Sequence, residues 1–196
     1  MNVSRETLDR LRAYEALVLK WSPKINLVSK GTLADTWGRH IVDSLQVIEL
    51  APKSGKWVDL GSGGGFPGIV AAICAMEADR DHDVILVESD ARKSAFLRTA
   101  LREIGVEGTV ITDRIENVPG QGADILTARA LTSLDGLLGF AKQHMAEQGI
   151  ALFPKGATWQ KEVEAAKEHW DFQAKMHPST THPDAVVLEV SEVKHV

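Results

Sequence analysis

One segment of the sequence restricts the possible folds more than any other. Residues 58–68 read VDLGSGGGFPG, an apolar run that leads into a loop with five glycines in the eight residues from Gly61 to Gly68. Glycine has no Cβ, so such a loop can adopt left-handed backbone conformations and pass close beneath a ligand. A purely structural turn is disfavoured, because ordering so many glycines is unfavourable in conformational entropy. The segment therefore predicts a ligand-binding turn between a strand and a helix, whose first N–H groups suit a carboxylate or phosphate.

Apolar runs and helical patterns alternate after this loop, which predicts a Rossmann-like, doubly wound α/β fold. The last two strands are separated by Pro178 and Pro183, so we expect them to form a C-terminal antiparallel hairpin on an otherwise mostly parallel seven-stranded sheet. The expected strands are 57–60, 84–87, 110–111, 125–128, 150–153, 172–176 and 186–190, and the expected helices are 67–76, 90–104, 133–145 and 159–168.

Two helical patterns precede the first strand. The first is capped by Ser4 and is expected to end at Pro23, and the second runs from residue 32 to about residue 50. We therefore expect residues 1–55 to form an N-terminal helical extension and residues 56–196 to form one compact ligand-binding domain.

The composition excludes several classes of protein. The longest apolar stretch, residues 69–76, is far shorter than the roughly 20 residues that span a bilayer, and no signal peptide is recognisable. Cys74 is the single cysteine, so disulfides and thiolate metal clusters are not expected, and His177 and His182 lack zinc spacing. We expect a cytoplasmic bacterial protein without a membrane partner and without a metal.

The charge distribution is uneven. The net charge is −5, but residues 1–56 hold nine Lys/Arg against six Asp/Glu, which leaves −8 for the remainder. A basic N-terminal region could contact phosphates locally. On charge alone, a solvated helical surface is the favoured interpretation.

The identity of the ligand depends on the acids beside the glycine loop. The spacing of Gly63, Gly65 and Gly68 also satisfies the dinucleotide fingerprint, so the glycines alone do not decide. Asp59 lies two residues before Gly61, and a carboxylate there favours a cationic ligand such as S-adenosyl-methionine over a pyrophosphate. Glu88 ends the second strand and can accept hydrogen bonds from a ribose diol, which supports an adenosine ligand of either kind. We expect Asp59, Gly61, Gly63 and Glu88 to contact S-adenosyl-methionine.

Arg129 ends the fourth predicted strand, at the sheet edge where ligands bind in such folds. Residues 113–117 follow the third strand and are expected beside the adenine. The usual machinery for several methyl acceptors is missing: Cys74 sits within a predicted helix, and the chain has no Pro-Pro pair. A ring nitrogen such as N7 of guanine needs no base and only alignment with the methyl group, so it is consistent with this sequence.

Six segments, in order, resemble the RsmG (GidB, glucose-inhibited division protein B) family of bacterial small-subunit rRNA guanine-N7 methyltransferases. Each match is weak alone, but their order and spacing together are specific. The segments are Trp21–Ser29, Arg39–Leu45, Gly61–Ile69, Arg92–Leu97, Arg129–Ala130 and Lys155–Gly156.

The resemblance implies an activity and a set of site residues. It implies a 16S rRNA (guanine-527)-N7-methyltransferase that uses S-adenosyl-methionine, acts in the 530 loop on 16S rRNA or the 30S subunit, and works as a monomer. It implies cofactor contacts at Gly61, Phe66, Glu88, Ile115, Glu116 and Arg129, with Arg129 also the catalytic candidate. Substrate contacts are implied at Asn26, Arg39, His40, Asp43 and Lys155.

Three alternatives stay open from the sequence. Arg39, His40 and Asp43 could instead form a buried polar network that ties the N-terminal helices to the sheet. A nicotinamide-dependent oxidoreductase could use the same glycine loop, although the single tyrosine, Tyr14, lies in the first helix and offers no hydride-site pair. A non-enzymatic RNA-binding or assembly protein would bind RNA without binding a cofactor.

Overall fold

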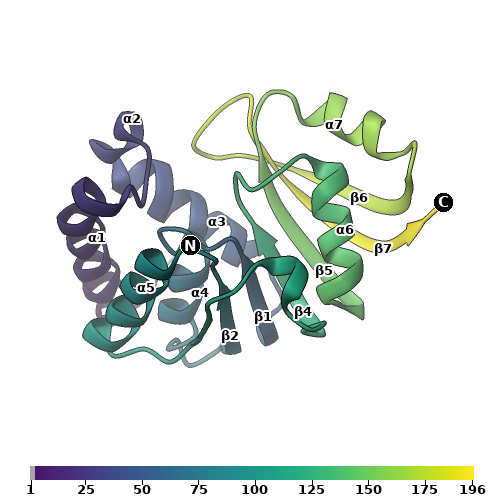
Figure 1. Ribbon diagram of the computed structural model, residues 1–196. Helices are drawn as coiled ribbons and strands as arrows, with labels where there is room; N and C mark the ends of the chain where they lie inside the picture. Colours follow the sequence, from purple (N-terminus) through teal and green to yellow (C-terminus); the bar gives the residue numbers. More distant parts are fainter. Residues whose placement is uncertain (1–2) are drawn as a thin grey trace.

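Seven strands form one twisted sheet in the order β3-β2-β1-β4-β5-β7-β6 in the computed structural model, which describes residues 3–196 (Figure 1). The predicted strands are all present, most of them longer than expected. Their bounds are β1 Ser54–Leu60, β2 Asp81–Val87, β3 Thr109–Ile111, β4 Ala123–Ala128, β5 Met145–Lys155, β6 Trp170–Pro178 and β7 Val186–His195.

The order in which successive strands are added to the sheet reverses at β1. β1 pairs in parallel with both β2 and β4, so the chain adds β2 and β3 on one side and β4 and β5 on the other. Ligands bind beyond the C-terminal ends of the strands at such a switch point. β7 pairs antiparallel with β5 and with β6, which confirms the predicted C-terminal hairpin.

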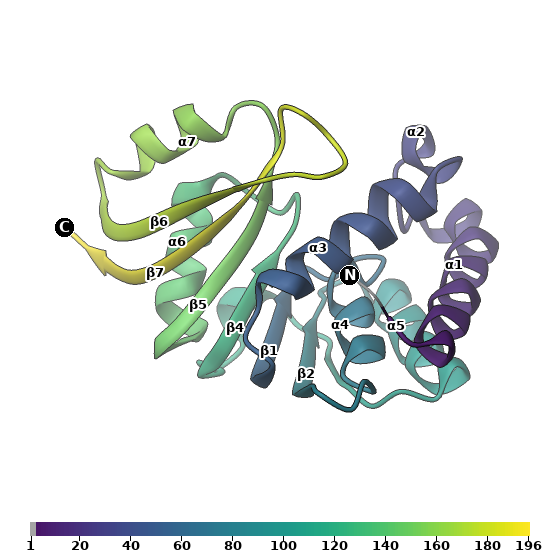
Figure 2. The same ribbon diagram turned by 180° about the vertical axis from the view of Figure 1, so that it is seen from behind.

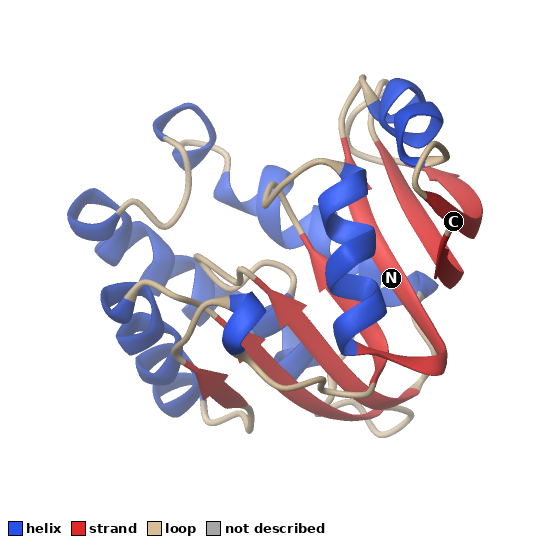
Figure 3. Cartoon of the chain, turned by 45° about the vertical axis from the view of Figure 1, so that its right-hand side comes forward, coloured by secondary structure: helices blue, strands red, loops and turns tan. Residues whose placement is uncertain are grey.

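Helices cover both faces of the sheet (Figures 1 and 3). One apolar core lies between the sheet and α1, α3, α4 and α5, and includes Trp57 of β1. The other lies beneath α6 and α7 and includes the neighbouring residue Val58, because successive side chains of a strand point to opposite faces. The helices are α1 Arg5–Ile25, α2 Lys30–Leu33, η1 Trp37–Val42, α3 Asp43–Leu50, α4 Gly68–Cys74, α5 Ala91–Ile104, η2 Ile115–Asn117, α6 Leu134–His144 and α7 Trp159–Ala166.

The N-terminal helices differ from the prediction in two ways. Ser4 caps α1 as expected, but the prediction that Pro23 ends this helix is wrong, since α1 continues to Ile25. Proline removes its own N–H without preventing the next residues from bonding, and Asn26 N–H still donates to the carbonyl of Ser22 at 2.9 Å. The single helix expected over residues 32–50 is wrong as well, because the segment divides into α2, the π-helix η1 and α3.

The helices before β1 contribute to the core of the sheet. Leu11, Tyr14 and Val18 of α1 are completely buried and belong to the same apolar cluster as Ile69 and Ile73 of α4. Across residues 3–196, the structure has no helix with the length and apolar character needed to cross a bilayer.

Candidate functional site

Three adjoining cavities lie at the C-terminal ends of the central strands, and Arg129 and Ala130 line all three. The strand-end cavity, of about 490 Å³, is bounded by Gly61, Gly63, Glu88 and η2. The loop cavity, of about 370 Å³, lies between the glycine loop and residues 27–32. The hairpin cavity, of about 370 Å³, lies between η1, the end of β5 and the loop that joins β6 to β7.

The glycine loop needs its glycines for conformation and for packing. Gly61, Gly63 and Gly65 have φ values of +63°, +54° and +88°, which other residues rarely adopt. A Cβ at Gly65 would lie 2.7 Å from the Tyr14 hydroxyl and would also collide with Ile69. The Tyr14 hydroxyl donates a hydrogen bond to the carbonyl of Gly64. Helix α1 therefore supports the loop from behind, and burial raises the pKa of Tyr14 well above its ordinary value.

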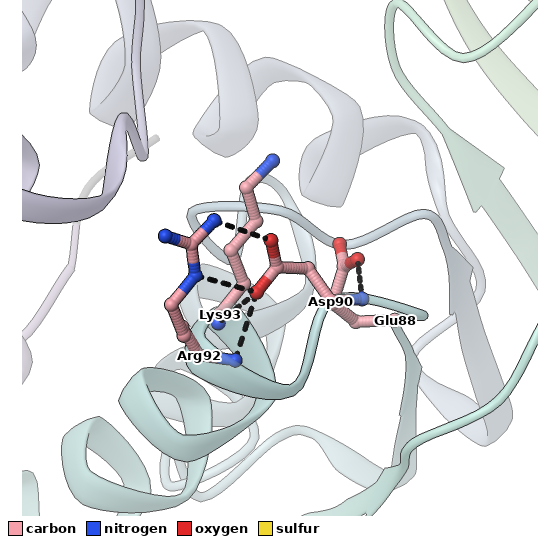
Figure 4. A network of polar contacts seen from close by, with 4 residues as sticks. All are labelled: Glu88, Asp90, Arg92 and Lys93. Carbon is pink, nitrogen blue, oxygen red and sulfur yellow. Dashed lines mark hydrogen bonds and ion pairs between the residues drawn. The ribbon is translucent and has the colours of Figure 1, made fainter.

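Glu88 joins the glycine loop to the start of α5. Its Oε2 accepts from the N–H of Gly63 at 2.8 Å, and its Oε1 accepts from the N–H of Asp90 at 2.7 Å. Asp90 caps α5 as predicted, and hydrogen bonds from Arg92 and from the N–H groups of Arg92 and Lys93 lower its pKa to about 2 (Figure 4). A carboxylate has about four acceptor positions, so Glu88 keeps capacity for a further donor from a ligand.

Asp59 lies behind the glycine loop and does not line any of the three cavities. The side chain is buried on the α4 face of β1, where Thr127 Oγ1 donates to its Oδ1 at 2.8 Å. Its Oδ2 is buried without a geometric hydrogen bond among residues 3–196. Burial raises the pKa of Asp59 to about 6, against the opposing effect of the hydrogen bonds and of Arg129.

Arg129 is held by a chain of directed hydrogen bonds. Its Nη1 donates to Nδ1 of His40 at 2.8 Å. Since arginine only donates, His40 Nδ1 accepts, and the proton on Nε2 is donated to Thr32 Oγ1 at 2.8 Å. Burial, followed by the charges of Arg129 and Arg39, lowers the pKa of His40 to about 4, so this histidine is neutral at pH 7.

Phe66 completes the packing around this chain. Its ring stacks on the imidazole of His40 with centroids 5.0 Å apart, and the guanidinium carbon of Arg129 lies 5.3 Å from the Phe66 centroid. Burial lowers the pKa of Arg129 from its ordinary value, whereas the nearby charge of Asp43 raises it. The guanidinium stays protonated, because the arginine pKa lies far above the physiological range.

The structure brings most of the predicted cofactor contacts together at the strand-end cavity. Gly61, Gly63, Glu88, Ile115, Glu116 and Arg129 all line it. Phe66 instead lines the loop cavity. Tyr14 and Lys93 are not singled out by the sequence patterns as part of the site. Lys93 lines both the strand-end and loop cavities, and its side chain extends past Asp90 in Figure 4.

The predicted substrate residues are more dispersed. Arg39, His40, Asp43 and Lys155 line the hairpin cavity, whereas Asn26 is exposed at the end of α1 in a left-handed conformation and lines none of the three. Lys155 Nζ forms an ion pair with Glu162 of α7 at 2.8 Å.

Arg39, His40 and Asp43 do not form one buried network. His40 is buried, Asp43 is half-buried and Arg39 is exposed. His40 bonds with Arg129 and Thr32, and Asp43 bonds with Gln46 and Thr181, so no hydrogen bond joins the side chains of His40 and Asp43. This arrangement places two separate polar groups on the wall of one cavity.

Comparison with protein families gives a match over nearly the whole chain. The GidB family model, described as rRNA small subunit methyltransferase G, matches residues 7–187. A relative from Ruegeria pomeroyi, named ribosomal RNA small subunit methyltransferase G, is 55% identical over 196 residues that cover 100% of this chain and 96% of the relative. A relative of the same name from Rhizobium meliloti is 46% identical over 98% of this chain and 92% of its own length.

Solved structures share the fold at low sequence identity. A TehB-like SAM-dependent methyltransferase from Corynebacterium glutamicum superimposes with a TM-score of 0.61 at 13% identity, covering 92% of this chain and 98% of that one. A SAM-dependent methyltransferase from Aquifex aeolicus also gives a TM-score of 0.61, at 10% identity, covering 79% of this chain and 92% of that one. The Rossmann-like methyltransferase fold expected from the sequence is therefore confirmed.

Proposed function

Since the chain belongs to the rRNA small subunit methyltransferase G family, we propose that it methylates N7 of guanine 527 in the 530 loop of 16S rRNA. The broader activity is S-adenosyl-methionine-dependent methylation of small-subunit rRNA, which is the activity of the family to which it belongs. The position and the atom are the proposal.

The observation that carries the proposal is that Arg129 lines both a cavity suited to the cofactor and a separate cavity open to a substrate. The strand-end cavity fits an adenosine-containing ligand. Glu88 offers carboxylate oxygens at the end of β2, and the left-handed glycines leave the floor free of side chains. Ile115 supplies an apolar wall on the opposite side.

We assign the cofactor contacts to Gly61, Gly63, Glu88, Ile115, Glu116 and Arg129, with Phe66 and Asp59 supporting the loop from beneath. When bound, S-adenosyl-methionine supplies an electrophilic methyl group carried by a positively charged sulfur. The buried carboxylate of Asp59 lies on the side of β1 that faces α4. In this proposal Asp59 therefore does not touch the ligand. It acts from a distance, by holding the glycine loop in position and by its negative charge.

Catalysis in this proposal consists of alignment. N7 of guanine already carries a lone pair, so no residue has to remove a proton before transfer. Arg129 is the residue that acts on the substrate, because its guanidinium is fixed by His40 and can donate to guanine O6 or to a phosphate. Arg39 and Lys155 add positive charge to the hairpin cavity, and we propose Asn26, which precedes Leu27 of the loop cavity, as a further substrate contact.

The proposed partner is 16S rRNA, free or within the 30S subunit, and the proposed form is a monomer in the bacterial cytoplasm. Residues 1–56 carry nine Lys/Arg against six Asp/Glu, and these N-terminal helices could contact rRNA phosphates. Arg39 is exposed, and its side chain makes no hydrogen bond or ion pair with residues 3–196.

The test is transfer of a labelled methyl group to 30S subunits and to free 16S rRNA from a strain that lacks this modification. We expect label at N7 of guanine 527, mapped by chemical cleavage at N7-methylguanosine, with transfer by the Arg129→Ala variant lowered about 100- to 1000-fold. Label at another nucleotide, or no transfer to either substrate, would contradict the proposal.

A further inference from the structure

The hairpin cavity is built from segments that are far apart in the sequence. η1 and the start of α3 form one wall, and the end of β5 with the loop between β6 and β7 forms another. Figure 2 shows this loop reaching from the hairpin toward α3. The cavity of about 370 Å³ shares Arg129, Ala130 and Thr132 with the strand-end cavity, so a molecule held in it would lie next to a cofactor.

One carboxylate in this cavity is oriented by its neighbours. The hydroxyl of Thr181 donates to Oδ1 of Asp43, and the amide of Gln46 donates to the same oxygen at 3.3 Å. Gln46 in turn accepts from the N–H of Thr180 at 2.9 Å. Oδ2 of Asp43 accepts no hydrogen bond from any of residues 3–196, so the carboxylate is fixed with one acceptor oxygen still available.

The lining of the cavity holds three cationic side chains, Arg39, Arg129 and Lys155, against two carboxylates, Asp43 and Glu162. The ammonium of Lys155 is already paired with Glu162 at 2.8 Å, so Asp43 is the lining carboxylate outside that ion pair. A carboxylate only accepts hydrogen bonds, so it selects donors. The Watson–Crick edge of guanine presents two adjacent donors, N1–H and the N2 amino group, whereas adenine presents a lone pair at N1.

The positions of the nitrogen atoms in guanine also suit this orientation. N7 lies on the side of the purine opposite to N1 and N2, so a guanine bound through its Watson–Crick edge presents N7 away from that contact. Enzymes that modify a base extrude it from the stack and read it through hydrogen bonds to that edge. Ala130 lines both the hairpin cavity and the strand-end cavity, so the two cavities adjoin there.

We propose that the hairpin cavity receives the target guanine as an extruded base, with Oδ2 of Asp43 accepting hydrogen bonds from N1–H and from the N2 amino group. This inference rests on the proposed function and assigns the specificity for guanine to one side chain. The loop between β6 and β7 then takes part in recognition, because its Thr181, together with Gln46 of α3, holds the carboxylate of Asp43 in place.

The test compares guanosine with inosine at the target position of 16S rRNA reconstituted into 30S particles. Inosine keeps N7 and N1–H but lacks the N2 amino group. With the wild-type protein we expect kcat/KM for inosine to be about 10-fold lower than for guanosine, the size of one lost base-edge contact. With Asp43→Ala we expect a fall of about 100-fold on guanosine, and the difference between the two bases should disappear.

Two further variants control for folding. Asp43→Asn keeps the shape of the side chain and should also lose most of the discrimination, since a neutral amide is a weaker acceptor. Asp171→Asn changes an exposed carboxylate of β6 outside the cavity and should retain the wild-type ratio. Because Asp43 does not line the strand-end cavity, affinity for S-adenosyl-methionine should stay within about 3-fold of wild type in all variants.

The outcomes separate the two proposals. If the wild-type protein methylates neither particle, the proposed function fails. If it methylates guanosine and inosine equally well, or if Asp43→Ala and Asp43→Asn both keep the wild-type ratio, then the assignment of Asp43 is wrong and the proposed function stands.

Discussion

The strand-end cavity and the hairpin cavity meet at Arg129 but are constructed differently. The first is lined by the ends of β1, β2 and β4 and by the short η2, so its shape follows directly from the parallel sheet. The second depends on a π-helix and on a contact between Asp43 and Thr181, which are 138 residues apart. The comparison teaches that, in the proposed division of roles, the sheet itself supplies the cofactor site, whereas selection of the substrate depends on elements added around the sheet.

The largest effect is expected at the residue that the two cavities share. Arg129→Ala removes the charge, the donor to His40 and the contact with Phe66. We expect kcat/KM for methyl transfer to fall about 100- to 1000-fold, as for loss of a positioned donor in other enzymes. Arg129→Lys keeps the charge but lacks the planar guanidinium, so its kcat/KM should lie between those of the wild type and the alanine variant. An alanine variant within 3-fold of wild type would show that the cavities are not coupled through this side chain.

The second prediction concerns stability beneath the strand-end cavity. The pKa of Asp59 is raised to about 6 from 3.8, so the folded state holds this proton to a higher pH than the unfolded state. Its contribution to stability is greatest below pH 3.8 and is lost as the pH rises through about 6, a difference of about 3 kcal/mol.

Asp59→Asn should remove this pH dependence. Urea unfolding gives the free energy of unfolding of both proteins at pH 4 and pH 7.5. The stability of the asparagine variant relative to the wild type should be greater at pH 7.5 than at pH 4. Parallel profiles for the two proteins would contradict the assignment. If the variant also keeps its affinity for S-adenosyl-methionine, Asp59 stabilises the fold and does not contact the cofactor.

The third prediction separates the loop from the rest of the site. Gly65→Ala forces a side chain into a backbone with φ of +88° and against Tyr14, a strain of about 1–3 kcal/mol. We expect affinity for S-adenosyl-methionine to fall about 10- to 100-fold by calorimetry. The matched control is Gly31→Ala, where an added Cβ meets no atom within 4 Å. Equal effects from the two variants would show that the loop conformation does not matter.

The smallest effect is expected at His40, which orients Arg129 from the side of η1. His40→Gln can still accept from Arg129 and donate to Thr32, so it should stay within about 3-fold of wild type, whereas His40→Ala should lower kcat/KM about 10-fold. The pKa of His40 is lowered to about 4, so its neutral form stabilises the fold above pH 6.5, and this contribution is lost as the pH falls through about 4. A glutamine variant as impaired as alanine would refute this role.

The sequence predicts the lining of the strand-end cavity better than that of the hairpin cavity, for physical reasons. Gly61 and Glu88 follow apolar strands, and the ends of parallel strands meet at one edge of the sheet. The pattern does not reveal which face of β1 carries Asp59, and that face proves to be the one covered by α4. A strand that is buried on both faces lacks the alternation of polar and apolar residues that would show which side chains share a face.

The substrate side could not be predicted because its contacts are not local. The π-helix η1 adds a residue to a turn, which helical periodicity does not register. The tie between Gln46 and Thr180 depends on how the hairpin packs against α3. Tyr14 could have been suspected, since its three-residue spacing from Leu11 marks the buried face of α1 and a buried tyrosine hydroxyl needs a partner.

Calorimetric titration with S-adenosyl-methionine tests the division between the two cavities most directly. The wild-type protein and Asp43→Ala should bind the cofactor with similar affinity, and Gly65→Ala should bind it at least about 10-fold more weakly. If the wild-type protein releases no heat of binding, or if Asp43→Ala weakens binding as much as Gly65→Ala does, the two cavities do not have the separate roles assigned to them.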